Sequence, residues 1–393
     1  MRFGINTLFL IPGKVGGTEI FLRNLIEQLS KHSQEFKEEY YLFTNVENDK
    51  LFINLPKNFK KFKCPIKASN RLMRIIWEQL FLPFLCLYYK IALLHSPGYT
   101  CPLFAPCKKL TTIFDLNYHF HSEDFTKIQL AVYKFLIPLV AKKTSYILVH
   151  SKRTRKELVE VLGIDKNKIF VIYGGFHQRF LDRFPKNKID DILKEFEVKK
   201  PFILSTAVSY PHKNAAALIL AYYQLLKRNP KLKHILVFLG FPGRDQRELE
   251  KIISKGKIKK RVLFTGWIDH NKVPAFYQAA DIFVFPSLYE GFGLPPLEAM
   301  ASGVPLIASK ASCIPEIVGN GGILVDAQNP ENISREMERV LNDKRLQAIM
   351  IKKGRQRAAN FSWDKCVRQT RNLYIQLIKK TNSSPERIKE ELG

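Results

Sequence analysis

The sequence predicts an α/β fold with two doubly wound domains, each built on a parallel sheet covered by helices. Two observations carry this prediction. Short apolar runs alternate with amphipathic segments along the chain, as in successive βαβ units. This alternation stops once, at the polar segment 181–200, and then starts again. The length of 393 residues agrees with two domains, because a single core rarely grows that large.

The expected strands are short apolar runs. The first half contains MRFGINTLFL, EYYLFTN, IALLHSP, LTTIFDL, SYILVHS and KIFVIYG, and the second half contains PFILSTAV, KHILVFLG, RVLFTGW, DIFVFPS, VPLIASK and GGILVDA. A helix is expected at 18–31, where the apolar residues share one face. We therefore expect a Rossmann-like N-terminal domain at 1–182, a linker at 183–199 and a second Rossmann-like domain at 200–361. A C-terminal helix and polar tail at 362–393 would pack back towards the first domain. Because parallel sheets bind ligands at the C-terminal ends of their strands, a ligand is expected in a cleft that both domains face.

The composition points to an acidic partner. The formal net charge is +27, which fits nucleic acid, an anionic membrane surface or phosphate-rich substrates, or simply a lysine-rich solvated surface. The six cysteines are scattered without a CxxC pair, as in a cytoplasmic protein with reduced thiols and no structural zinc. Charged and polar residues interrupt the apolar segment 72–95, so no transmembrane helix is expected.

The most informative segment is PSLYEGFGLPPLEAMASGVP, residues 286–305. It predicts a strand, a glycine-rich loop and a helix of about two turns, with Pro295 and Pro296 in the first turn and Gly303 just past the end. The backbone N–H groups from Gly291 to Leu294 would then form an anion site at the helix N-terminus.

Two carboxylates frame this loop, Glu290 and Glu298. Each would repel a phosphate, but each could accept hydrogen bonds from hydroxyl groups on either side of the phosphates. A nucleotide sugar has that arrangement of ribose, diphosphate and sugar hydroxyls. The alternative is that both glutamates only favour the helix dipole. Because two of them flank one glycine-rich turn, we favour the ligand-binding interpretation.

This segment, with its glutamates eight positions apart, resembles the signature of the family-four ("group 1") retaining glycosyltransferases, in particular mannosyltransferase-like members. FTGWIDHNKVPAFYQAADIFVFPS before it, KASCIPEIVGNGGILVDAQNPENI after it, FSWDKC near the C-terminus and GGTE near the N-terminus extend the resemblance. It implies a GT-B fold, whose N-terminal domain binds the acceptor and whose C-terminal domain binds the donor.

The resemblance also implies roles for individual residues. Glu290 would contact the transferred sugar, Glu298 the ribose, and Lys213 the leaving diphosphate, a form of electrostatic stabilisation. Glu290, Lys213 and Asp115 are the expected catalytic residues. The expected contacts of the donor nucleotide sugar are Gly16, Gly17, His212, Lys213, Glu290, Gly291, Phe292, Gly293, Leu294 and Glu298.

The sequence departs from the family pattern at two places. Near Lys213 the family usually has an arginine, whereas this chain has His212 and reads STAVSYPHK. Where relatives often have His-Asp, this chain has Phe114-Asp115, so a histidine near the sugar would have to be His119 or His121. For those two histidines we favour a position on the loop surface. At Lys213 a surface lysine at a helix start is the alternative.

The resemblance implies a metal-independent, retaining transfer of a hexose, mannose as the first choice, from a GDP- or UDP-linked donor. The acceptor would be a saccharide or lipid-linked saccharide of bacterial envelope polysaccharide or lipopolysaccharide. No Asp-x-Asp occurs, so no metal site is expected, and no cofactor either. GxGxxG and P-loop fingerprints are absent from the sequence too.

Two other functions remain open. A basic nucleic-acid-binding protein would explain the charge, but no nucleic acid partner is expected because its usual motifs are absent from the sequence. A catalytically inactive sugar-nucleotide binder is the other alternative. The basic segment 56–84 suits the anionic inner face of the cytoplasmic membrane, where the protein would bind peripherally. It also fits a solvated loop followed by a buried helix, and we expect much of its apolar part to be core.

Overall fold

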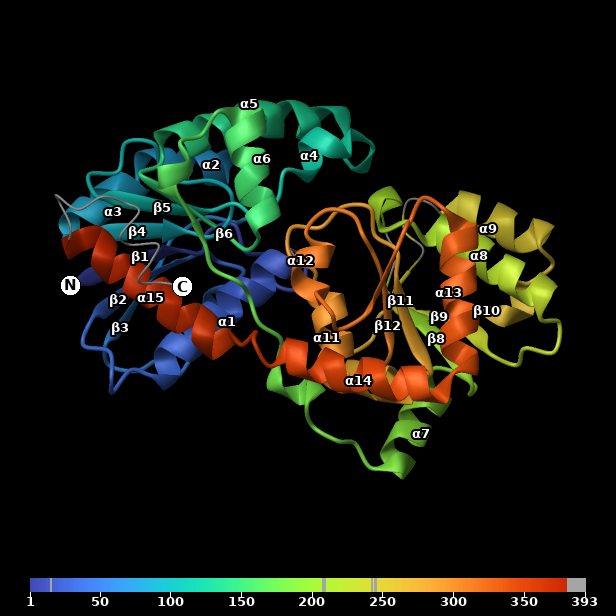
Figure 1. The fold of residues 1–393 in the computed structure, drawn as a ribbon. Helices are drawn as coiled ribbons and strands as arrows, with labels where there is room; N and C mark the ends of the chain where they lie inside the picture. Colours follow the sequence, from blue (N-terminus) through green and yellow to red (C-terminus); the bar gives the residue numbers. More distant parts are fainter. Residues whose placement is uncertain (15, 207–209, 242, 244–245, 380–393) are drawn as a thin grey trace. The chain divides into compact units, whose positions relative to one another are not determined.

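The computed structural model describes residues 1–14, 16–206, 210–241, 243 and 246–379, and these form two compact units (Figure 1). Unit 1 contains residues 1–120 and 125–174 and the chain from Trp363 onward. Unit 2 contains residues 121–124 and 175–362. The polar tail expected at the end of the chain falls at 380–393, outside the described residues.

Unit 1 is built on a parallel sheet with the strand order β3-β2-β1-β4-β5-β6-β7. The strands are β1 (Arg2–Asn6), β2 (Glu39–Thr44), β3 (Phe59–Lys63), β4 (Leu93–Ser96), β5 (Lys108–Thr112), β6 (Tyr146–Val149) and β7 (Ile169–Val171). Buried Phe3, Leu42 and Leu94 show why such apolar runs become central strands. The six strands expected in this half are all present.

β3 was not expected, because its sequence FKKFK is mostly lysine. It lies at the edge of the sheet and pairs with β2, from Tyr40↔Phe59 to Thr44↔Lys63. Lysines on an edge strand hinder pairing with another chain. The solvated loop that was the alternative for the start of segment 56–84 is therefore partly a strand.

Helices surround the sheet of unit 1 (Figure 1). They are α1 (Gly17–Lys31), α2 (Arg71–Leu80), α3 (Leu82–Tyr88), α4 (Asn117–Phe120), α5 (Lys127–Lys143), α6 (Lys152–Leu162) and α15 (Trp363–Lys379). The predicted apolar face of α1 is confirmed, since Leu22, Leu25, Ile26 and Leu29 are buried. The expectation for α2 and α3 was partly wrong, because many of their large apolar side chains are exposed.

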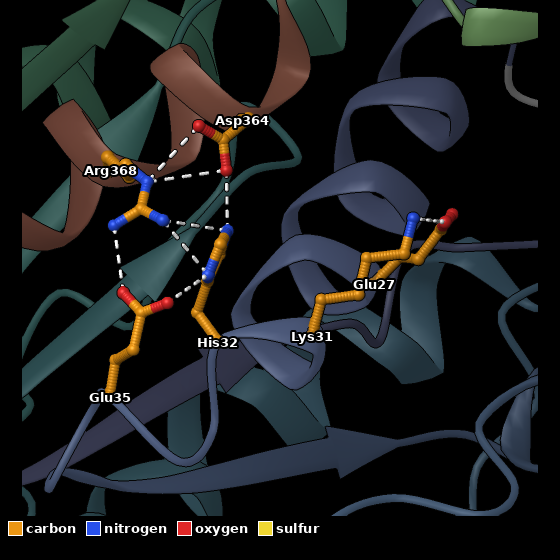
Figure 2. A network of polar contacts seen from close by, with 6 residues as sticks. All are labelled: Glu27, Lys31, His32, Glu35, Asp364 and Arg368. Atoms are coloured by element: carbon orange, nitrogen blue, oxygen red, sulfur yellow. Dashed lines mark hydrogen bonds and ion pairs between the residues drawn. The ribbon is translucent and has the colours of Figure 1, made fainter.

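α15 follows unit 2 in sequence but packs within unit 1. Its Tyr374 is buried and hydrogen-bonds Nδ1 of the buried His95 on β4. Figure 2 shows a second contact, in which Arg368 lies 3.0 Å from Glu35 and 3.1 Å from Asp364, with His32 between the two carboxylates. Contacts with β4 and with the segment after α1 therefore anchor the last helix.

Unit 2 is built on a second parallel sheet, in the order β10-β9-β8-β11-β12-β13. Its strands are β8 (Phe202–Ser205), β9 (Ile235–Phe238), β10 (Val262–Phe264), β11 (Ile282–Phe285), β12 (Leu306–Ser309) and β13 (Ile323–Val325). Its helices are α7 (Lys186–Glu195), α8 (Ala215–Arg228), α9 (Gln246–Lys255), α10 (Val273–Ala279), α11 (Leu294–Ser302), α12 (Ile314–Val318), α13 (Pro330–Asn342) and α14 (Lys344–Ala358). The predicted class, two parallel sheets each covered by helices, is confirmed. Among the described residues, no helix is both long and apolar enough to cross a bilayer.

Candidate functional site

The glycine-rich loop of unit 2 lies between β11 and α11, at the C-terminal end of a buried strand. Gly293 has a φ of 99° and precedes the first helical residue, Leu294. Pro295 and Pro296 follow in the first turn, and Gly303, with a φ of 77°, ends the helix. The helix predicted from the proline and glycine positions is therefore confirmed.

The N-terminus of α11 offers hydrogen-bond donors. Within the residues that the structure describes, the N–H groups of Gly291, Gly293 and Leu294 donate to no acceptor. Phe292, between them, is 9% exposed and packs edge-on against Phe361. Unpaired N–H groups at the positive end of a helix dipole form an environment suited to an anion.

The backbone of Glu290 is clamped by the loop between β12 and α12. Its N–H group donates to the Ser312 hydroxyl at 3.2 Å, and its carbonyl accepts from that hydroxyl at 2.8 Å and from the Cys313 thiol at 3.0 Å. Ser312 has a φ of 55°, which an L residue rarely adopts. The position of Glu290 is thus determined by a neighbouring loop whose residues had not been assigned to the site.

Lys213 and Glu290 form an ion pair, with Nζ 2.7 Å from Oε1. Both side chains are largely buried, at 24% and 12% exposed. Lys213 ends a short 3-10 helix, Pro211–Lys213, and the next residue, Asn214, has a φ of 62°. The Asn214 side chain donates to the carbonyls of Pro286 and Ala327, which fixes this turn against the ends of β11 and β13. Lys213 is therefore not the surface lysine of the alternative reading.

Glu298 lies one turn into α11 and accepts a hydrogen bond from the Tyr277 hydroxyl of α10 at 3.3 Å. Burial raises the pKa of Glu298 to about 7, against smaller opposing effects of Tyr277 and of the Arg179 cation. Burial also raises the pKa of Tyr277 well above its usual value, so its hydroxyl stays a donor. A carboxylate in this environment gains from any further hydroxyl that donates to it.

Nδ1 of His212 lies within hydrogen-bond distance of a carboxylate oxygen of Asp124. Both side chains are buried, at 8% and 2% exposed. The nearby ring of His121 lies 5.8 Å from that of His212 and 5.5 Å from that of Tyr289, next to Glu290. His119 is exposed, as expected, and the side chain of His121 is partly exposed, at 18%. Asp124 was missed, since a contact across 88 residues leaves no local sequence signal.

The other three predicted residues belong to unit 1. Gly16, with a φ of 58°, precedes α1, and among the described residues, chain neighbours apart, no heavy atom would lie within 4 Å of a Cβ at Gly16 or Gly17. The loop is held by Glu19, which accepts from the Gly13 N–H at 2.7 Å and is ion-paired with Arg23. Sequence reasoning overlooked Glu19, although it is the last letter of the GGTE motif.

Asp115 follows β5, and its Oδ1 accepts the N–H group of Asn117 at 3.0 Å. The ring of its neighbour Phe114 packs against Phe21 of α1. The Asp115 loop and the helix after the glycine loop are thus neighbours within unit 1. Among the described residues, no group of three or more His, Cys, Asp or Glu side chains is placed to hold a metal ion.

Comparisons with known protein families match most of the chain. Residues 187–357 match the model described as "Glycosyl transferases group 1", and residues 15–178 match "Glycosyltransferase Family 4". The O-antigen chain mannosyltransferase B of Escherichia coli is 28% identical over 73% of this chain and 74% of its own length. The O-antigen chain mannosyltransferase RfbU of Salmonella typhimurium is 27% identical over 67% of this chain and 69% of its own length. The mannosyltransferase WbdA of Escherichia coli is 30% identical over 56% of this chain but only 28% of its own length.

Several solved structures share the fold. Sucrose-phosphate synthase from Thermosynechococcus elongatus superposes with a TM-score of 0.75 at 21% identity, over 96% of this chain and 99% of that chain. The Anabaena protein HepE, in complex with UDP and glucose, superposes with a TM-score of 0.74 at 18% identity, over 96% of this chain and 100% of that chain. WaaG, a glycosyltransferase involved in lipopolysaccharide biosynthesis, superposes with a TM-score of 0.70 at 13% identity, over 98% of this chain and 100% of that chain. At these identities the likeness shows the fold alone.

Proposed function

Because the chain belongs to the group 1 glycosyltransferase family and has its GT-B fold, we propose that it transfers a hexose from a nucleotide diphosphate sugar to a saccharide or lipid-linked saccharide. The first choice of sugar is mannose, and the pathway is O-antigen or related lipopolysaccharide synthesis. The names of the relatives RfbU and mannosyltransferase B support both choices. The reaction would take place in the cytoplasm, at the inner face of the membrane.

The observation that carries the proposal is the Lys213–Glu290 ion pair beside the free N–H groups of α11. A diphosphate at the helix N-terminus would accept hydrogen bonds from Gly291, Gly293 and Leu294. The Lys213 ammonium would neutralise the charge that builds on the leaving phosphate. Glu290 would accept hydrogen bonds from hydroxyls of the sugar. Because Glu290 also contacts Lys213, it would align the sugar with the leaving phosphate.

The remaining residues of the site would recognise the rest of the donor. Glu298 would accept hydrogen bonds from the ribose hydroxyls, as its carboxylate already accepts one from the Tyr277 hydroxyl. His212, paired with Asp124, would keep the turn before Lys213 in place. In unit 1, the open loop at Gly16 and Gly17 and the carboxylate of Asp115 would bind phosphate or hydroxyl groups of the substrates.

Transfer with retention would proceed on one face of the sugar. The bond between C1 and the phosphate oxygen breaks as the acceptor oxygen forms its bond to C1 on the same face. The acceptor hydroxyl proton passes to the leaving phosphate oxygen, so the reaction needs no protein nucleophile. Lysine and N–H groups would take the place of a metal ion in stabilising the diphosphate.

The test is a thermal-shift panel of GDP-, UDP- and ADP-linked sugars in EDTA, followed by NMR of the product anomer. We expect GDP-mannose to raise the melting temperature most, and a ligand at 100 times its Kd adds about 2.7 kcal/mol of stability. We also expect an α-linked product from the α-linked donor. An inverted product would refute retention, and loss of transfer in EDTA would refute metal independence.

Other outcomes of the panel favour the alternatives. Binding of a nucleotide sugar without transfer or donor hydrolysis, with a full set of acceptors, would favour an inactive binder. Salt-sensitive binding of RNA with no shift from any nucleotide sugar would favour a nucleic-acid-binding protein.

A further inference from the structure

α2 is an amphipathic helix whose apolar face points outward. The only residue of α2 that is fully buried is a carboxylic acid, Glu78. Four apolar side chains of the same helix are exposed instead: Leu72 at 68%, Met73 at 48%, Ile76 at 40% and Leu80 at 55%. A core-packing helix has the opposite arrangement.

The apolar surface continues beyond α2. Phe81 between the helices is 52% exposed, and Phe84, Leu87 and Tyr88 of α3 are 70%, 63% and 77% exposed. Phe104, in a loop bound to α2, is 84% exposed. We call the exposed apolar side chains of residues 72–88, together with Phe104, the α2–α3 platform. Single exposed apolar residues are ordinary, but a contiguous run of this kind marks an interaction surface.

Contacts beneath the platform hold it in this orientation. The Thr100 hydroxyl donates to Glu78 at 3.2 Å, and the Gln79 amide donates to the Cys101 carbonyl at 3.0 Å and accepts from the Leu103 N–H at 2.9 Å. On α3, Leu82 and Cys86 are buried in the core of unit 1. These contacts hold Glu78 and Gln79 on the inner side of α2, and Leu82 and Cys86 anchor α3 in the core, so the remaining apolar side chains face outward.

The charge around the platform is mostly positive, although Glu47 accepts the N–H groups of Ala68 and Ser69 beside it. Residues 56–109 contain ten lysines and arginines and a single acidic residue, the buried Glu78. Lys60 and Lys61 are paired with Glu39 and Asp49. Within the described part of the chain, Lys67 and Arg71 at the start of α2 and Lys90 after α3 have no acidic group at salt-bridge distance.

We propose that the α2–α3 platform docks on an anionic phospholipid bilayer. Its aromatic and aliphatic side chains would enter the region below the headgroups, while Lys67, Arg71 and Lys90 contact lipid phosphates. A second copy of the chain fits less well, because the same face would meet its own positive charge. The inference concerns unit 1 alone and goes beyond the transfer reaction.

The experiment is co-sedimentation of the full chain with vesicles of equal parts phosphatidylglycerol and phosphatidylcholine, and with pure phosphatidylcholine. We expect binding to the anionic vesicles, weakened by salt. Phe84→Ser should reduce it about tenfold, given the free energy of burying one phenyl ring. Phe135→Ser on α5 is the matched control, since Phe135 is 73% exposed in the same unit. Lys67→Glu should weaken binding as well, whereas Lys251→Glu on α9 should not.

Three results would overturn the proposal: no binding of the parent chain to anionic vesicles, an equal loss in Phe135→Ser, or a concentration-dependent dimer that Phe84→Ser abolishes. The last result would assign the platform to a second copy. Unchanged melting temperature and donor thermal shift of Phe84→Ser show that folding and donor binding are intact. A failure of docking is thereby distinguished from a failure of the proposed transferase function.

Discussion

The ammonium of Lys213 lies 2.7 Å from a carboxylate oxygen of Glu290, although 77 residues separate them. They come together because β8 and β11 are adjacent strands, and each residue lies in the segment that follows its strand. The strand order of the sheet reverses between these two strands. Such a switch point is where open α/β sheets bind ligands.

If Lys213 and Glu290 act as one unit, the effects of their substitutions on kcat should not be additive. We expect Lys213→Ala and Glu290→Gln each to lower kcat about 100-fold or more, as for loss of a group that stabilises a leaving anion. The double variant should be little worse than the worse single variant. Transfer rates at saturating donor measure this.

Lys310→Ala is the control, because Lys310 forms an exposed ion pair with Asp326 in the same unit. It should keep the parental rate. Parental kcat in both Lys213→Ala and Glu290→Gln would mean that the catalytic site lies elsewhere.

The raised pKa of Glu298 makes donor binding pH-dependent. Hydroxyls of the ribose donate to the ionised carboxylate, so binding should lower this pKa and release a proton. With a pKa of about 7 in the free protein, the Kd for the nucleotide should be about tenfold weaker at pH 6 than at pH 8. Isothermal titration calorimetry in two buffers of different ionisation enthalpy measures both the Kd and the proton release.

The raised pKa of Glu298 also makes folding pH-dependent, but folding is favoured at low pH, whereas donor binding is favoured at high pH. Because the folded protein binds this proton more tightly than the unfolded chain, Glu298 favours folding at low pH, and this contribution is lost as pH rises from about 4.5 to about 7. Glu298→Gln should therefore abolish the pH dependence of donor affinity and raise the melting temperature at pH 8 but not at pH 4. A pH-independent Kd in the parent chain would contradict the assignment of Glu298 to the ribose.

Some elements of the fold could be predicted from the sequence and others could not. Strands such as β11 were predicted because a buried parallel strand is a continuous apolar run, whereas β3 could not be, because its lysines lie on an edge. The outward face of α2 was also missed. Apolar periodicity shows that a helix has two faces, but which of them meets the core depends on tertiary contacts such as that of Glu78 with Thr100.

The site divides in the same way. Glu290, Glu298 and the helix between them are close in sequence, and their glycines and prolines mark the turn. Asp124 and Tyr277 are polar partners supplied by distant segments, and nothing in their local sequence distinguishes them from surface residues.

Gly303 should tolerate a side chain poorly, mainly because of its left-handed backbone. It ends α11 with a φ of 77°, and a Cβ there would lie 2.6 Å from Nε of Arg355 on α14. Gly303→Ala combines the left-handed backbone penalty of about 1–2 kcal/mol with the smaller cost of displacing the flexible Arg355 guanidinium. Gly163→Ala has the same penalty without the clash, since Gly163 has a φ of 64° and open space around it. Chemical denaturation should give a larger loss for Gly303→Ala, and adding Arg355→Ala should recover the difference. Equal losses would refute the steric argument.

Tyr374 should determine how firmly α15 is held in unit 1. Burial lowers the pKa of His95 to about 3, so its ring is neutral and needs one donor and one acceptor; its partners are the hydroxyls of Tyr374 and Thr112. Tyr374→Phe leaves a buried ring nitrogen without a partner and should cost about 1–3 kcal/mol. Urea denaturation and hydrogen exchange of the α15 amides measure the loss. Tyr88→Phe is the control, because Tyr88 is 77% exposed, and this variant should leave stability unchanged. If Tyr374→Phe matched that control, the apolar contacts of Leu373 and Leu377 would be sufficient to anchor the helix, and the hydrogen bond to His95 would contribute nothing measurable.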